Sequence, residues 1–132
     1  AQFGLNYGIT NTSGKVLLEN VCDILDLANK NNINVIDTST QYGDSEKTIG
    51  LATQHINKKF NIVTKTRSFA NTNIKQALNY LDSDFANSIN NLKDNNIQAL
   101  LFHDCNDLLG GKADHLYKAA LNFKNNNSES FE

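Results

Sequence analysis

The chain has 132 residues, of which 39% are hydrophobic and 20% are charged, so its length and composition suit one globular domain over residues 1–132. Its net charge of -2 provides no basic footprint for nucleic acid, and no apolar run approaches the roughly 20 residues that span a bilayer. Two cysteines are too few for a disulfide scaffold, which favours a cytoplasmic setting.

The first expected element is a strand that is already ending at Ala1-Gln2-Phe3-Gly4. Because the chain also contains no methionine, we expect further residues upstream of Ala1. Three later segments are short and nearly continuously apolar, as is typical of parallel strands buried on both faces. These strands are predicted at residues 34–37, 61–65 and 98–103.

Helical spacing of apolar residues separates these strands. The first predicted helix has an apolar face formed by Leu17, Val21, Ile24, Leu25 and Ala28. Ser13 is its expected N-cap, and the Asn-rich stretch 29–32 is its expected end. Further helices are predicted over 45–57, over 73–93 with an interruption near residues 82–84, and over 113–124, followed by a loop or tail over 125–130.

Alternating strands and helices predict an α/β fold with a parallel sheet and right-handed crossovers. Four such units can form a small open sheet or half of an eight-fold barrel, and length alone does not decide between them. In a (β/α)8 barrel the functional groups lie at the carboxyl ends of the strands.

Four reactive side chains follow the expected strands: Asp37 and Tyr42 after the second, Lys65 at the end of the third, and His103 at the end of the fourth. Together they suit carbonyl reduction, which needs a proton donor beside the developing oxyanion. An unperturbed phenol is a reluctant donor at neutral pH, and a nearby ammonium favours its ionisation. A carboxylate can keep that ammonium charged, and an imidazole can orient the carbonyl.

The stretch from Ile33 to Gly50, INVIDTSTQYGDSEKTIG, resembles the aldo-keto reductase signature, roughly G-I-N-x-x-D-T-A-x-x-Y-G-x-S-E-x-x-L-G. Asn32, Ser39 and Ile49 replace the usual Gly, Ala and Leu. Residues 62–65 resemble the family's strand that carries the catalytic Lys, and residues 88–103 resemble the helix and strand that lead to its catalytic His.

The resemblance implies a TIM (β/α)8 barrel, of which this chain covers about the first four βα units. It also implies NADPH-dependent reduction of an aldehyde or ketone to an alcohol. Tyr42 would be the proton donor, Lys65 would assist it, Asp37 would pair with Lys65 and touch the cofactor, and His103 would orient the carbonyl. Most of the NADPH site would lie on later strands, outside this chain. The opening residues resemble bacterial members associated with surface sugars, which suggests a sugar-like carbonyl substrate.

The main alternative is a truncated, catalytically incompetent half-barrel, or a non-enzymatic scaffold on the same fold. A half-barrel has two open strand edges and an uncovered apolar face, so we expect it to self-associate. An open-sheet phosphatase or hydrolase also fits the alternation, but no nucleophile motif supports it.

Several other residues have more than one possible role or environment. A metal site at His103, Asp104, Cys105 and Asp107 is not expected, because adjacent residues rarely converge on one ion. Arg67 has either a surface role or contact with an anionic group, and Gly110-Gly111-Lys112 reads as a turn. Cys22 is predicted to lie in the core, and His55 and His115 in solvent.

Overall fold

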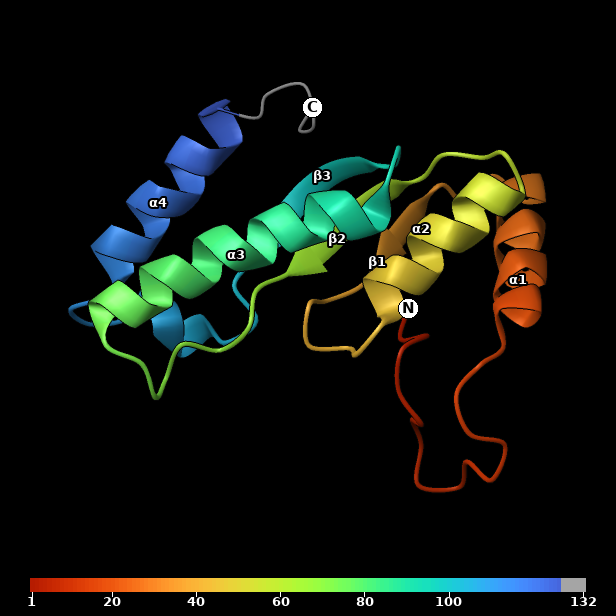
Figure 1. Ribbon diagram of the computed structural model, residues 1–132, viewed down its shortest axis with the longest axis horizontal. Coiled ribbons are helices and arrows are strands. Elements are labelled where there is room, and N and C mark those ends of the chain that lie inside the picture. The colour runs from red at the N-terminus through yellow and green to blue at the C-terminus, as the bar shows by residue number, and fades with distance from the viewer. Residues whose placement is uncertain (127–132) are drawn as a thin grey trace.

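The computed structural model describes residues 1–126 and has an α/β fold (Figure 1). The elements follow the chain in the order α1 (Leu18–Lys30), β1 (Val35–Asp37), α2 (Ser45–His55), β2 (Asn61–Lys65), α3 (Ile74–Leu92), β3 (Asn96–Leu101), the 3-10 helix η1 (Cys105–Leu108) and α4 (Ala113–Asn126). The strands form a parallel sheet in the order β1-β2-β3, so the predicted alternation of strands and helices is confirmed.

One face of the sheet carries the core. The register aligns Ile36, Ile62 and Ile97, all buried against the helices, and each helix packs on the next in chain order. The opposite face, called the open face below, presents Val35 and Leu101, each 45% exposed. A sheet covered by helices on one face only is what a segment of a β/α barrel provides.

The N-terminal strand expected at residues 1–4 is not formed among the described residues. The segment nevertheless lies beside the sheet, because the Ala1 ammonium donates to the Asp37 carbonyl. The Phe3 amide donates to the Ser45 side-chain oxygen at 3.1 Å, so this amide is not available to a backbone ladder with β1. The described sheet therefore has three strands, one fewer than predicted.

The start of α1 differs from the sequence prediction. Leu17, not Ser13, is its N-cap, and no side chain caps the helix. Ser13 belongs instead to a turn around Asn11, whose side-chain oxygen accepts the amides of Ser13 and Gly14 at 2.9 and 3.0 Å. The backbone at Ser13 is thus part of a turn four residues before Leu17, outside the first turn of α1.

The predicted interruption of α3 near residues 82–84 is wrong, because the helix is continuous. It begins with a capping box formed by Asn73 and Gln76. The Ser83 hydroxyl donates to the Tyr80 carbonyl within the same helix, and Asp84 is ion-paired with Arg67. The Ser83 hydroxyl thus bonds a carbonyl of the helix itself, the Asp84 carboxylate is held by Arg67, and the helix continues through both residues.

Other boundaries move by a few residues. α2 ends at His55, two residues before the predicted limit, and Asn57 has a left-handed φ of 51°. β3 covers Asn96–Leu101, so His103 lies beyond the strand. α4 runs to Asn126, which corrects the predicted loop at 125–126, while the rest of that prediction lies outside the described residues.

The predicted environments of several single residues are confirmed. Gly110 forms a turn before α4 with a φ of 83°. Cys22 is buried, and His55 and His115 are exposed. Within residues 1–126, no helix is both long and apolar enough to cross a membrane.

Candidate active site at the strand ends

The centre of the candidate site is an ion pair between the ends of β1 and β2. Because these strands are parallel neighbours, Asp37 and Lys65 end at the same edge of the sheet. The Lys65 Nζ donates to Asp37 Oδ1 at 2.6 Å and to the Thr38 carbonyl at 3.0 Å. The Lys65 side chain is 19% exposed and the Asp37 side chain 55%, so the ammonium is the more sheltered partner.

Tyr42 reaches this ion pair on a turn that leaves β1. The Tyr42 amide donates to the Ser39 carbonyl, and the Ser45 amide donates to the Tyr42 carbonyl, both at 3.1 Å. The Lys65 Nζ lies 5.7 Å from the centroid of the Tyr42 ring. The turn thus returns the phenol to the ammonium five residues after the strand has ended.

Glycine is required at position 43 in this turn. Its φ is +57°, and a Cβ there would lie 2.7 Å from the Gly4 carbonyl oxygen and from a Leu5 methyl carbon. Side chains rarely adopt this backbone conformation, and the close approach leaves no space for one. Gly43 therefore lets the N-terminal segment pack directly against the turn that carries Tyr42.

His103 joins the group from beyond the end of β3. Its ring lies 6.0 Å from the Tyr42 ring at an interplanar angle of 85°, an edge-to-face arrangement. Its Nδ1 lies 3.1 Å from the Ser39 hydroxyl oxygen. The structure therefore brings all four predicted site residues to one edge of the sheet, and their catalytic roles stay predictions.

Ser39 is the functional candidate that sequence reasoning missed. In the family pattern it replaces alanine at a position with no catalytic role. It is fully buried and contacts the imidazole of His103, 64 residues away in the sequence. A hydroxyl at a motif position that usually holds alanine was the available signal.

The helix side of β2 carries a second polar network beneath Lys65. Thr64 and Ser88 donate to the same carboxylate oxygen of Glu46, at 2.6 and 2.8 Å. Glu46 is 4% exposed, and this burial raises the pKa of its carboxyl, although the hydrogen bonds oppose the shift. The carboxylate joins α2, β2 and α3 directly behind the strand end that carries Lys65.

Arg67 is partly exposed and paired with Asp84, which agrees with the predicted surface role. Its guanidinium donates to both carboxylate oxygens of Asp84, at 2.7 and 2.6 Å, and lies 4.5 Å from the Tyr80 ring centroid. The hydrogen bond and the charge of Asp84 raise the pKa of Arg67, despite its partial burial. Arg67 is therefore a structural partner of α3.

The side chains of the candidate site can be compared with the chemistry of NADPH, the cofactor that the family resemblance implies. A phenol, an ammonium and an imidazole suit the end of NADPH where a carbonyl substrate reacts. Arg67, the only arginine in the chain, donates to Asp84 through its Nε and Nη2 atoms. The residues present thus fit the reacting end of the cofactor.

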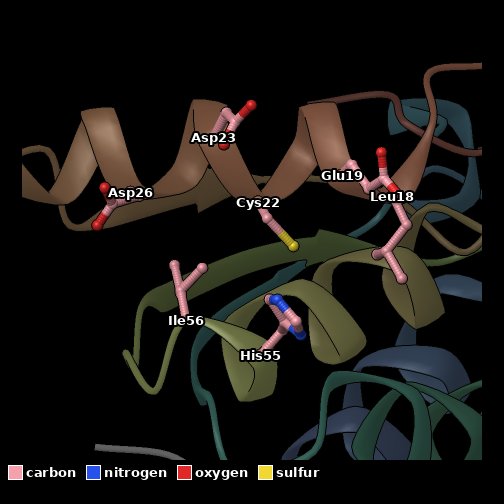
Figure 2. Close-up of a pocket in the computed structure, with 7 residues that line it drawn as sticks. All are labelled: Leu18, Glu19, Cys22, Asp23, Asp26, His55 and Ile56. Carbon is pink, nitrogen blue, oxygen red and sulfur yellow. The ribbon is translucent and has the colours of Figure 1, made fainter.

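A separate cavity of about 580 Å³ lies between α1 and α2 (Figure 2). Figure 2 shows the Cys22 sulfur directed from α1 toward α2, with His55 across the space. The lining residues are Leu18, Glu19, Cys22, Asp23, Asp26, His55 and Ile56. His55 is at the carboxyl end of α2, whereas the turn that carries Tyr42 leads into its amino end, so this cavity is not the candidate active site.

Metal ligation is not indicated around His103 either. Across residues 1–126, no group of three or more His, Cys, Asp or Glu side chains could hold a metal ion. The Asp107 carboxylate accepts the Phe69 amide, and the Asp104 carboxylate accepts the Asn106 amide. Two of the carboxylates in that cluster thus organise the backbone.

Comparisons with known proteins identify the family. The aldo/keto reductase family model matches residues 3–109, and the chain therefore belongs to the aldo-keto reductase family. Members of this family are oxidoreductases that generally use NAD(P)H. No curated protein matches the chain.

Solved structures extend the likeness to the fold. A Pseudomonas aeruginosa crystal structure, provisionally described as an aldo-keto reductase, aligns with a TM-score of 0.71 and 21% identity over 98% of this chain and 50% of its own. A second structure with the same provisional description and organism aligns with a TM-score of 0.67 and 21% identity, over 85% of this chain and 45% of its own. This chain spans about half the length of these structures, as a partial TIM barrel would.

Proposed function

We propose that this chain supplies the proton-donating half of an NADPH-dependent aldo-keto reductase that converts an aldehyde or ketone to an alcohol. The observation that carries the proposal is the position of the Lys65 ammonium, 2.6 Å from Asp37 and 5.7 Å from the Tyr42 ring centroid. NADPH, when bound, supplies the hydride that the carbonyl carbon accepts.

The chain's own residues handle the proton. The Tyr42 hydroxyl donates its proton to the carbonyl oxygen as negative charge develops there. The Lys65 ammonium stabilises the phenolate that remains, because an opposite charge nearby favours the ionised form. Asp37 holds Lys65 in place and is also our proposed contact to the cofactor, while His103 orients the carbonyl. A sugar-like carbonyl stays our predicted substrate class.

The test is Tyr42→Phe in the full-length protein, assayed by loss of NADPH absorbance with an aromatic aldehyde. We expect turnover to fall by about 10²- to 10⁴-fold, the usual contribution of a general acid, while NADPH affinity is retained. Tyr80→Phe is the matched control, because Tyr80 stacks on Arg67 away from the site, and it should keep normal turnover. Undiminished turnover in Tyr42→Phe would refute the proposal.

The second candidate is a non-catalytic half-barrel, favoured by the half-exposed apolar residues of the open face, such as Val35 and Leu101. In a complete barrel these side chains would be covered by further strands. Binding of NADPH, followed by its fluorescence, separates the two functions. Tight binding by the full-length protein favours a reductase, and the absence of binding by that protein favours the scaffold.

A further inference from the structure

The Ser39 side chain is placed where it can control the imidazole of His103. Ser39 ends the extended segment that continues β1, and its hydroxyl is completely shielded from solvent. The hydroxyl oxygen lies 3.1 Å from His103 Nδ1. In the family pattern this position usually holds alanine, which has no group to offer the ring.

The direction of this hydrogen bond follows from the partners around the hydroxyl. A serine hydroxyl has one proton to donate and can accept two hydrogen bonds. Its oxygen accepts the Gln41 amide at 3.1 Å. Its proton can go either to His103 Nδ1 at 3.1 Å or to the Lys65 carbonyl oxygen at the longer distance of 3.5 Å.

The Lys65 carbonyl is the poorer acceptor for a further reason. It already accepts the Thr40 amide at 3.1 Å and the Thr40 hydroxyl at 3.0 Å. A carbonyl oxygen has two lone pairs, so both are in use. The Ser39 proton therefore points to Nδ1, which must act as the acceptor.

We propose that Ser39 is a positioning residue that holds neutral His103 in the tautomer with its proton on Nε2. A neutral imidazole has one donor and one acceptor nitrogen, so an accepting Nδ1 leaves Nε2–H as the donor. The edge-to-face contact with Tyr42 limits rotation of the same ring. Donation from Nε2–H to a substrate carbonyl rests on the proposed reductase function. The tautomer of His103 does not depend on that function.

The tautomer can be measured by ¹⁵N NMR of the side-chain nitrogens of the full chain, at about pH 8.5, where imidazoles are neutral. The chain has three histidines, and His55 and His115 are exposed helical residues that serve as internal references. We expect His103 to show the widely separated shifts of a fixed Nε2–H form. His55 and His115 should show the averaged shifts of exchanging tautomers.

Two variants test whether Ser39 is the cause. Ser39→Ala installs the residue usual in the family, and it should move the His103 shifts toward the averaged values of the references. Ser83→Ala is the matched control, because it removes a serine hydroxyl that bonds the Tyr80 carbonyl within α3 and not His103 or the Lys65 carbonyl. It should leave the His103 shifts unchanged.

Three outcomes would overturn the proposal: a proton on Nδ1 in the unaltered chain, averaged His103 shifts in that chain, or identical His103 shifts in Ser39→Ala. The first two need no variant, so they remain decisive if Ser39→Ala does not fold. Because the measurement requires neither cofactor nor turnover, a negative reductase assay would leave this result standing. Where the full-length enzyme is active, Ser39→Ala should lower kcat by about 2- to 10-fold, the scale of one hydrogen bond, with the KM for NADPH unchanged.

Discussion

Gly50 lies where α2 closely approaches α3, and its replacement by alanine should destabilise the folded chain. Gly50 lies inside α2, where alanine would normally stabilise the helix by about 1 kcal/mol. However, an alanine Cβ would lie 2.0 Å from the Asn91 carbonyl oxygen on α3. Because this oxygen belongs to the backbone, it cannot rotate away as a side chain could, and the two helices would have to move apart.

Forcing an extra methyl group into a packed contact costs about 1–3 kcal/mol, and a clash with backbone belongs at the upper end. After subtraction of the helix gain, we expect Gly50→Ala to lower the free energy of unfolding by about 2 kcal/mol. The same movement would loosen Ser88 on α3 from Glu46 on α2.

The measurement is urea unfolding followed by far-ultraviolet circular dichroism. Gly111→Ala is the matched control, because its added Cβ would meet nothing within 4 Å and its backbone has no positive φ. It should change the free energy of unfolding by less than about 0.5 kcal/mol. A Gly50→Ala chain as stable as the unaltered chain, or more stable, would refute this reasoning.

Three further predictions concern charge and association. Burial raises the pKa of Glu46 above its ordinary value of 4.5, so the folded chain binds that proton more tightly than the unfolded chain. The free energy of unfolding should therefore fall as the pH rises from 4.5 through the raised pKa. In urea titrations at several pH values, Glu46→Gln should lack this fall, and an equal dependence on pH in the two chains would contradict the assignment. Asp84→Asn leaves the partly buried Arg67 without its charge partner and should lower the free energy of unfolding by about 1–3 kcal/mol, a loss that an unchanged urea midpoint would exclude. An apolar groove between β3 and α4 includes the half-exposed Leu101 and Tyr117, so the 132-residue chain should self-associate in sedimentation experiments. Leu101→Lys should weaken this association, and a monodisperse monomer of the unaltered chain would count against the prediction.

The catalytic candidates were predictable because their signal is local. Asp37 and Tyr42 belong to one continuous motif, and Lys65 and His103 follow apolar runs that predict strands. Parallel strands bring their carboxyl ends to one edge, so the order of elements was enough to predict that these residues would meet.

Two of the errors and omissions involve partners that are distant in sequence. Asp84, at the predicted interruption of α3, pairs with Arg67, 17 residues away. The contact of Ser39 with His103 spans 64 residues. Helical periodicity and capping rules describe neighbours within about four residues, so neither contact could be inferred from them.

The sequence by itself therefore determined the family, the alternation of strands and helices, and the chemical groups at the strand ends. Each of these three features depends on residue types that lie close together in the sequence. Only the tertiary structure decided what those groups touch. It assigned Arg67 to Asp84 and placed a buried Ser39 hydroxyl against His103. Hydrogen-bond direction depends on which partners are within reach and already satisfied, and that is a property of the folded chain alone.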